Sequence, residues 1–594
     1  MIVLGYNGFG KVAELFARYY GSTGLDRHML YGHDSSAALT VDGELVAAVE
    51  EERLNREKKT ARFPREAIAW VLRQGGLTFD DVDVFAHSWR FSEDIMNNMI
   101  REITDADAPV DKKFARLRRL DDTHARIFSR EAILADFHEH TGHRLTDDRL
   151  VSVPHHIAHL MTGYHLSGGG DAAFVVSDGR AEWLSAILGE VRDGKVHIFD
   201  DATVDGDNSL ALLFAVLTRY LGFTPNNDEY KVMGLAGFGP PPEHNPLLKH
   251  VVELTGDGRY TIPYAPRAVR AYYALFDRIF DTGPDGREDF EVRVRVAAAA
   301  QEMVEKVTAH QLRALEERST LPRLLFEGGL ALNCVNNTKL LESSRFAEMD
   351  VSFGASDPGV AIGAAFYAGQ EAGATPRVTR SPYLGPAYGD ADILAALEEH
   401  ADQVDWRELD PGQVAAETAA LLQDKNVVGW FQGRMEYGPR ALGNRSILAN
   451  PRFADIKDII NERIKHREPF RPFAPVVLED VAREVFEMGK KRVSPYMTFV
   501  FPVRPGYRDL IPGATHVDGT SRIQTLGERD NPLLAGLLRS FTALTGIPCL
   551  INTSFNVAGE PIVCSPADAV DCFLKTEMDY LVMGRFVAAK SAQR

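Results

Sequence analysis

Residues 171–200 read DAAFVVSDGRAEWLSAILGEVRDGKVHIFD, and the interpretation of the chain begins from this stretch. Apolar runs alternate with two Asp-Gly pairs, Asp178-Gly179 and Asp193-Gly194, which are strong signals for turns between neighbouring strands. We therefore predict three consecutive strands. The same pattern occurs near the start of the chain, where IVLGYN, SAALTV and ELVAAVE precede a helical segment that begins beyond Pro64.

Two units of three strands in one chain indicate an internal duplication within a mixed α/β fold. Actin and the sugar kinases are built in this way, from two ribonuclease-H-like halves that close on a nucleotide. Two unrelated hairpins are the alternative interpretation, and the pattern alone does not separate the two.

Composition narrows the function classes. At 594 residues the chain is too long for a single core, so roughly two to four domains are expected. The net charge of −18 argues against a large nucleic-acid footprint. No apolar run approaches a membrane span, and the N-terminus does not resemble a signal peptide, so we expect a cytoplasmic protein. The four cysteines show no CxxC spacing and are interpreted as buried thiols.

A histidine pair lies in VPHHIAHLMTGYHLSG, residues 153–168. His155 and His159 are four residues apart, so they share one face of a helix. The glutamate of the HExxH pattern is absent, so metalloprotease hydrolysis is not indicated. A helical histidine pair is more often structural, but Asp178 and Asp357 add two candidate carboxylates. Such a mixed set favours Fe(II), Mn(II) or Zn(II) over calcium.

A candidate nucleotide contact follows the apolar run LLFEGG, which ends in Gly328 and Gly329 before a helix start. This kind of junction lets a nucleotide's sugar or phosphate approach the main chain closely. Paired glycines are more often only a turn. Lys231 precedes another segment of small residues.

We predict a domain linker at residues 374–410, which open with a run rich in proline, glycine and threonine. The chain then divides into domains at 1–373 and 411–594.

The second domain contains GRMEYGPRALGNRSIL, residues 433–448, with three arginines among regularly spaced glycines. Arginine matches phosphate or carboxylate with two bonds at once. Further polar segments around Lys465, Arg522 and Asn552 interrupt apolar strands. They are either solvent-facing loops or the walls of one polyanion pocket, and their number favours the pocket.

Several motifs together resemble one family. They are GHDSSAAL, HHIAH, YKVMGLA, EGGLALN, GRMEYGPRALGNRSIL, KHREPFRPFAP, HVDGTSRIQT and NTSFNVAGEP. In combination the chain resembles the O-carbamoyltransferases of antibiotic and nodulation-factor biosynthesis, including the tobramycin and cephamycin enzymes. The resemblance implies an N-terminal actin-like domain, similar to the tRNA threonylcarbamoyl-transferase, and a C-terminal YrdC-like α/β domain.

The resemblance also implies a reaction. Carbamoyl phosphate would be cleaved in the C-terminal domain, and the carbamate would be joined to ATP with Mg²⁺, releasing pyrophosphate. The carbamoyl adenylate would then pass to the N-terminal domain, where a hydroxyl of a small molecule, expected to be a natural product, attacks it.

Roles for individual residues follow from the same resemblance. The metal ligands fall on His155, His159, Asp178 and Asp357, with Fe²⁺ as the expected ion. The catalytic residues are His33, Arg440 and Lys465. Substrate contacts fall on Lys58, Arg522, Asn552 and Ser554. Nucleotide contacts are expected at Lys231, Gly328, Gly329, Asn333 and Asp357. Without the resemblance, His33 reads as a structural histidine at a turn.

Three alternative functions fit parts of the pattern. A carbamoyltransferase that matures hydrogenases would carry zinc-finger CxxC pairs, and the sequence has none. A tRNA-modifying enzyme of the threonylcarbamoyladenosine type would combine the same two folds, but the charge of −18 speaks against it. A non-catalytic nucleotide-binding regulator would not need the arginine-rich loop and the metal set together. The sequence names neither the acceptor nor a role for the helical segment 85–150, and a homodimer is the working hypothesis for assembly.

Overall fold

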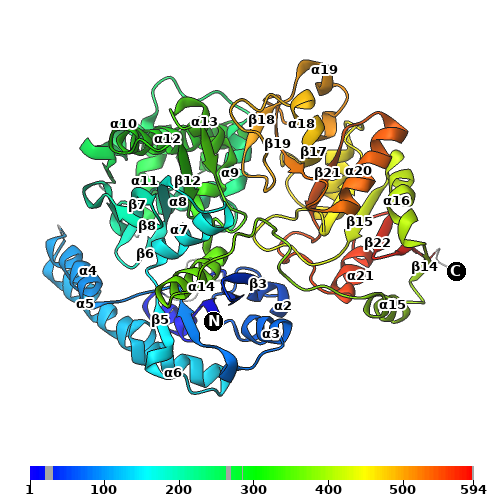
Figure 1. The fold of residues 1–594 in the computed structure, drawn as a ribbon. Coiled ribbons are helices and arrows are strands. Elements are labelled where there is room, and N and C mark those ends of the chain that lie inside the picture. The colour runs from blue at the N-terminus through cyan, green and yellow to red at the C-terminus, as the bar shows by residue number, and fades with distance from the viewer. Residues whose placement is uncertain (21–30, 107, 263–268, 284, 592–594) are drawn as a thin grey trace. The chain divides into compact units, whose positions relative to one another are not determined.

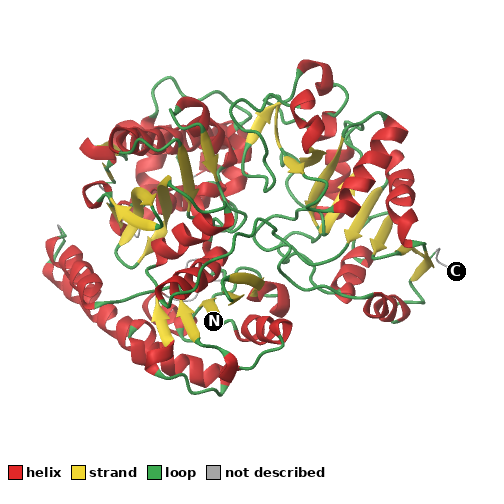
Figure 2. Cartoon of the chain, viewed as in Figure 1, coloured by secondary structure: helices red, strands yellow, loops and turns green. Residues whose placement is uncertain are grey.

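The computed structural model describes residues 1–20, 31–106, 108–262, 269–283 and 285–591. These form two compact units, Met1–Arg380 and Ser381–Arg594. Each unit combines sheets with covering helices, so the predicted mixed α/β class is confirmed (Figures 1 and 2).

The described part of the first unit contains two large sheets and a two-stranded one. One large sheet has the strand order β3-β2-β1-β4-β5, and the other has the order β13-β12-β6-β7-β8, with β9 added beside β7. The strands of the first sheet are β1 (Ile2–Asn7), β2 (Ser36–Val41), β3 (Glu44–Glu50), β4 (Val84–His87) and β5 (Leu150–Ser152). Those of the second are β6 (Ala172–Ala181), β7 (Leu184–Arg192), β8 (Lys195–Ile198), β9 (Val204–Asp205), β12 (Arg323–Glu327) and β13 (Glu348–Asp350).

The two sheets repeat one topology. In each, three consecutive strands pair antiparallel, and two later strands extend the sheet in parallel from the first of the three. This repetition supports the internal duplication. The Asp42-Gly43 turn between β2 and β3 has left-handed φ angles of 49° and 78°, as the sequence predicts for a tight hairpin.

One predicted turn is wrong. Strand β6 continues through Asp178-Gly179 to Ala181, and the chain reverses at Glu182 and Trp183 instead. The pairing with β7 shifts between Ser177 and Ala181, so the strand absorbs the Asp-Gly pair as an irregularity. Asp178 therefore projects from a strand and not from a turn.

Helices cover both sheets and connect them. They are α1 (Val12–Tyr20), α2 (Glu51–Asn55), α3 (Arg65–Gly75), α4 (Glu93–Asp105), α5 (Val110–Thr123), α6 (Arg130–Thr141), α7 (His155–Leu166), α8 (Leu210–Tyr220), α9 (Glu229–Ala236), α10 (Pro246–His250), α11 (Val269–Phe280), α12 (Phe290–Arg318), α13 (Cys334–Ser343) and α14 (Val360–Glu371). The segment 85–150 supplies α4, α5 and α6, which form a helical arm beside the first sheet (Figure 1). A short hairpin joins β10 (Glu253–Leu254) to β11 (Tyr260–Thr261).

Helix α14 packs closely against both β1 and α7, and glycines make this approach feasible. A Cβ at Gly5 would lie 2.1 Å from the carbonyl oxygen of Ala361, and one at Gly363 would lie 1.8 Å from that of Ala158. No other residue fits at such separations. The packing brings the start of α14, and with it Asp357, next to α7.

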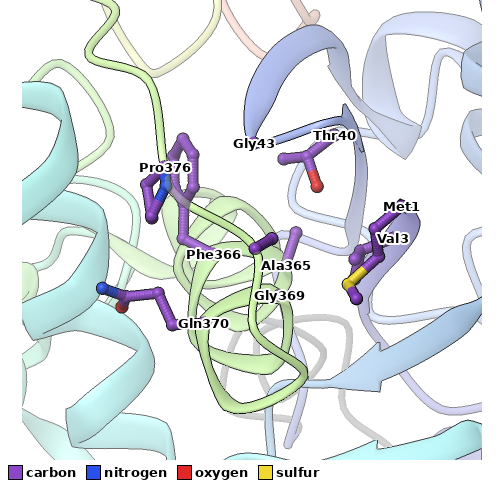
Figure 3. Close-up of a pocket in the computed structure, with 10 residues that line it drawn as sticks. Met1, Val3, Thr40, Gly43, Ala365, Phe366, Gly369, Gln370 and Pro376 are labelled. Carbon is purple, nitrogen blue, oxygen red and sulfur yellow. The ribbon is translucent and has the colours of Figure 1, made fainter.

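A small, mainly apolar pocket lies where the C-terminal part of α14 meets β1 and β2 (Figure 3). Val3, Thr40, Phe366 and Pro376 are among the residues that line it. None of the site residues predicted from the sequence lines this pocket, so it carries no part of the functional argument.

The second unit is built on a sheet of order β14-β23-β22-β15-β16-β21-β17-β20. Its strands are β14 (Val404–Glu408), β15 (Val427–Phe431), β16 (Arg445–Ala449), β17 (Ala474–Leu478), β20 (Gln524–Leu526), β21 (Cys549–Ser554), β22 (Tyr580–Met583) and β23 (Phe586–Lys590). A separate pair joins β18 (Val500–Pro502) to β19 (Thr520–Arg522). The helices are α15 (Asp390–Glu398), α16 (Val414–Gln423), α17 (Ile456–Ile459), α18 (Glu479–Val485), α19 (Pro505–Arg508), α20 (Pro532–Thr545) and α21 (Pro566–Leu574).

The division between the units falls at Arg380 and Ser381, within the interval 374–410 predicted as a linker. The later part of that interval is folded, because α15 and β14 lie within it and β14 pairs with β23. The apolar patterns of α15 and β14 are short, and the segment before them is rich in residues typical of turns. The prediction therefore placed both elements in the linker.

The four cysteines are buried thiols that form no disulfide with one another, as predicted. No helix among the described residues is both long and apolar enough to cross a membrane.

Candidate functional site

Four side chains in the first unit converge as the sequence predicted. His155 and His159 come from α7, Asp178 from β6, and Asp357 from the turn that precedes α14. Their ligand atoms lie within 4.8 Å of one another, and all four residues are buried. The Nε2 atoms lie 3.6–3.8 Å from the nearest oxygens of Asp178 and Asp357. Such separations are compatible with four atoms that all bind the same ion at distances of about 2.1 Å.

The surroundings of the two imidazoles favour metal binding through Nε2. Nδ1 of His155 lies 3.2 Å from the carbonyl oxygen of Ser88, which fixes that nitrogen as the donor and leaves Nε2 as a ligand. Neither ring nitrogen of the buried His159 has a hydrogen-bond partner among the described residues. Buried polar atoms normally find a partner, so this residue set fits a divalent transition ion.

Charge is balanced within the cluster. Burial alone would lower the pKa of His155, but Asp178 and Asp357 outweigh it and raise the pKa to about 10. Against its own burial, the pKa of Asp178 lies well below its ordinary value because His155 and His159 face it. Both carboxylates are therefore charged at neutral pH and available as ligands.

His33 lies beside the four candidate metal ligands. Its Nδ1 is 3.3 Å from Oδ2 of Asp357, while Oδ1 of the same carboxylate faces the two ligand histidines. On the other side of the ring, Nε2 lies 3.5 Å from Nδ2 of Asn226. The side chain of His33 is 21% exposed, so a ligand can reach it. The arrangement places an accessible imidazole next to the four converging side chains.

Strained backbone surrounds His33. Asp34, Lys59 and Asn226 all adopt left-handed φ angles, between 56° and 58°, which non-glycine residues rarely do. Such residues concentrate at functional sites. Lys59 forms a salt bridge with Asp34, while burial lowers the pKa of its neighbour Lys58. The resemblance assigned a substrate contact to Lys58 only, although Lys59 follows the same EEER stretch.

The predicted nucleotide contacts also have local partners. The N–H of Gly329 donates to Oδ1 of Asp178 at 2.7 Å, and a Cβ at Gly328 would lie 2.3 Å from the carbonyl oxygen of Ser177. Lys231 pairs with an Asp228 oxygen at 3.0 Å. Asn333 caps α13 and donates to Gln301 at 2.8 Å. The N–H of Gly329 thus helps to hold the candidate metal ligand Asp178 in place.

In the second unit, the arginines of residues 433–448 differ in their surroundings. Arg445 is fully buried and donates to four main-chain carbonyl oxygens, and Arg434 donates to those of Leu384 and Gly385. Glu436 Oε1 accepts three main-chain N–H groups of the same loop. Arg440 is half-buried. Residue type and spacing did not reveal that Arg434 and Arg445 bond to main-chain carbonyl oxygens of the protein itself.

Lys465 organises the end of β21. Its buried Nζ donates to the carbonyl oxygen and Oγ of Ser554 and to the carbonyl and side-chain oxygens of Asn556. No carboxylate takes part in these four contacts. The ammonium charge is therefore held close to Ser554.

Asn552 bonds to residues close in sequence to the predicted Arg522 and Arg440. Nδ2 of Asn552 donates to Gln524, two residues after Arg522, and approaches the carbonyl oxygen of Ala441, next to Arg440. Oδ1 of Asn552 and Nε of Arg522 are buried without hydrogen-bond partners among the described residues. Asn552 and Ser554 are two apart on β21 and so share one face of that strand.

Residues 24–366 match the family model described as the carbamoyltransferase N-terminus, and residues 419–590 match the carbamoyltransferase C-terminus. The chain belongs to the carbamoyltransferase family. It is accordingly a transferase enzyme.

Curated relatives agree with this assignment. This chain is 36% identical to nodulation protein NolNO of Sinorhizobium fredii, over 99% of its own length and 83% of that protein. It is 32% identical to the 3′-hydroxymethylcephem-O-carbamoyltransferase of Amycolatopsis lactamdurans, over 58% of this chain and 61% of that enzyme.

Among solved structures, component A of the (R)-2-hydroxyglutaryl-CoA dehydratase from Acidaminococcus fermentans is similar to 63% of the chain, at 12% identity. The alignment covers 99% of that protein, with a TM-score of 0.31. This score is too low to establish a shared fold.

Proposed function

We propose that this enzyme is an ATP-dependent O-carbamoyltransferase that moves a carbamoyl group from carbamoyl phosphate, through carbamoyl adenylate, to a hydroxyl of a small molecule. Family membership gives the transferred group. The observation that carries the rest is the pairing of His33 with Asp357 beside four converging metal ligands. A natural product is the acceptor class that we propose, because a relative is named for a cephem.

In this proposal the first unit is an actin-like transfer domain, supported by its repeated sheet topology. The second unit, which we propose to be YrdC-like, forms the adenylate. Carbamoyl phosphate reacts with water to give carbamate and phosphate. A carbamate oxygen then attacks the α-phosphorus of ATP, and pyrophosphate leaves.

Cations are needed for this step because it brings several anionic groups together. Arg440, Lys465 and Arg522 supply them, with Mg²⁺ on the ATP phosphates. Asn552 and Ser554 bind the smaller substrate from β21. Carbamate is a poor electrophile, and adenylation of its anionic oxygen makes that oxygen part of a good leaving group, AMP.

In the transfer step, Nε2 of His33 accepts the proton of the acceptor hydroxyl. The hydroxyl oxygen bonds to the carbamoyl carbon, and the bond from that carbon to the AMP oxygen breaks. Asp357 orients His33 through Nδ1 and would hold the metal, with His155, His159 and Asp178. Fe²⁺, when bound, would supply a Lewis acid for the adenylate. Lys58 and the nucleotide-binding residues Lys231, Gly328, Gly329 and Asn333 would contact the adenylate.

The test uses purified protein with ATP, Mg²⁺ and carbamoyl phosphate, without an acceptor. We expect pyrophosphate release that requires carbamoyl phosphate and is lost in Arg440→Ala. Release that does not depend on carbamoyl phosphate, or an Arg440→Ala variant as active as wild type, would contradict the proposed role of the second unit.

A further inference from the structure

The start of helix α7 is capped from another element. Pro154 precedes the helix and supplies no side-chain hydrogen bond to it. The first N–H groups of any helix lack helical partners. In α7 the first of these groups belongs to the ligand His155, and it donates to Oε1 of Glu182 at 3.1 Å.

The same oxygen of Glu182 holds a second segment. It accepts the N–H of Arg90 at 3.1 Å. Arg90 lies two residues after Ser88, whose carbonyl oxygen sets the ring orientation of His155. Glu182 itself follows β6, four residues after Asp178. One oxygen atom therefore joins the start of α7, residues 88–90 and the end of β6. These three segments determine where His155 and Asp178 lie.

Glu182 adopts an unfavourable backbone to do this. Its φ angle is 44°, and the residue is only 7% exposed. A non-glycine residue in the left-handed region is strained by its Cβ, and glycine would avoid this strain. Glycine has no carboxylate, however, so it would leave the N–H groups of His155 and Arg90 without this acceptor.

We propose that Glu182 is a positioning residue of the metal centre, which fixes the ligand His155 relative to Asp178 by accepting the N–H groups of His155 and Arg90 on one oxygen. The inference rests on the metal site of the proposed function. It predicts that the hydrogen-bonding oxygen, and not the negative charge, is what matters.

The first unit contains a matched control. Helix α3 also begins after a proline, Pro64, that supplies no side-chain cap. A buried glutamate from another element again takes the role, since Glu51 accepts the N–H groups of Glu66 and Ala67 at 3.2 and 2.7 Å. Helix α3 carries none of the candidate ligands. Loss of Glu51 should therefore affect stability without affecting the metal.

The experiment titrates the metal-free, full-length protein with Co²⁺, followed by its visible absorption and by calorimetry. His159→Ala defines binding outside the site. We expect Glu182→Ala to weaken Co²⁺ binding by about 10–100-fold, as loss of an outer contact to a metal ligand typically does. Glu182→Gln keeps Oε1 and should bind nearly as wild type does. Glu51→Ala should lower the melting temperature and leave Co²⁺ affinity unchanged.

The outcomes separate the two proposals. Wild-type protein that binds no Co²⁺ overturns the metal site of the proposed function and this inference with it. Wild-type affinity in Glu182→Ala overturns the positioning role alone, as does equal weakening by Glu51→Ala. Should Glu182→Ala not fold, Glu182→Asp keeps the charge but is one methylene too short for both contacts. It must then bind Co²⁺ more weakly than Glu182→Gln, and equal binding overturns the inference.

Discussion

The carboxylate of Asp357 lies between His33 and the candidate metal ligand His159. Its Oδ2 is 3.3 Å from Nδ1 of His33, and its Oδ1 is 3.6 Å from Nε2 of His159. Nε2, on the opposite side of the ring, lies 3.5 Å from Nδ2 of Asn226. In the proposed mechanism Nε2 accepts the proton of the acceptor hydroxyl. The contact thus ties the proposed base to the ion that would bind the same carboxylate.

Replacement of His33 tests that relationship. In His33→Ala we expect carbamoyl transfer to fall by about 10²–10⁴-fold, the usual contribution of a positioned general base. Adenylate formation should persist, because the residues proposed for it belong to the second unit. The measurement compares pyrophosphate release with product formation on a panel of hydroxyl acceptors that begins with 3′-hydroxymethylcephem.

An asparagine serves as the control for this variant. Asn226→Ala removes the amide 3.5 Å from Nε2 and leaves the imidazole in place. We expect a weaker effect that falls mainly on the KM of the acceptor. If His33→Ala abolishes pyrophosphate release as well, the division of labour between the units is wrong.

The sequence pointed to the four candidate metal ligands, which lie together in the structure, because their signals are local or shared with a family. His155 and His159 follow helical spacing, and Asp178 and Asp357 stand in recognisable motifs. It misplaced the turn at Asp178-Gly179, because the turn preference of a dipeptide does not take into account the pairing of β6 with β7. It missed Glu182, whose role depends on a helix that begins 27 residues earlier in the chain.

Arg440 and Arg445 should respond differently to mutation, although they occur in one motif. Arg445→Ala removes a fully buried guanidinium that donates to four carbonyl oxygens, so we expect a loss of about 3–5 kcal/mol in stability. Arg440→Ala, at a half-buried position, should change stability by less than about 1 kcal/mol yet abolish pyrophosphate release. Thermal unfolding and the release assay on both variants check this. The sequence could not separate the two, since residue type and spacing do not reveal whether an arginine bonds to its own loop.

Lys465 should be required both for substrate binding and for order at the end of β21. Lys465→Met keeps the length of the side chain but removes every donor to Ser554 and Asn556. Carbamoyl phosphate at 100 times its Kd should stabilise wild type by about 2.7 kcal/mol and leave the variant unaffected. Thermal shift with inorganic sulfate is the control for general anion effects. An equal shift in wild type and variant would remove Lys465 from the site.

Glu327 should make the stability of the first unit depend on pH. It is almost fully buried beneath α7, where it accepts the N–H and the hydroxyl of Ser352, each at 2.9 Å. Burial raises its pKa from 4.5 to about 8, with Ser352 only partly offsetting the effect. The folded protein therefore keeps this proton up to about pH 8, whereas the unfolded chain releases it near 4.5.

This difference fixes the sign of the effect. Stability from the retained proton is fully present below pH 4.5 and is lost as the pH rises through 8, with an upper limit of about 5 kcal/mol. Glu327→Gln keeps the shape and cannot ionise. Urea unfolding at pH 5.5, 7.0 and 8.5 should show the variant gaining stability relative to wild type at each step. A difference that stays constant across this range would mean that Glu327 is ionised in the folded protein, stabilised by a partner other than Ser352.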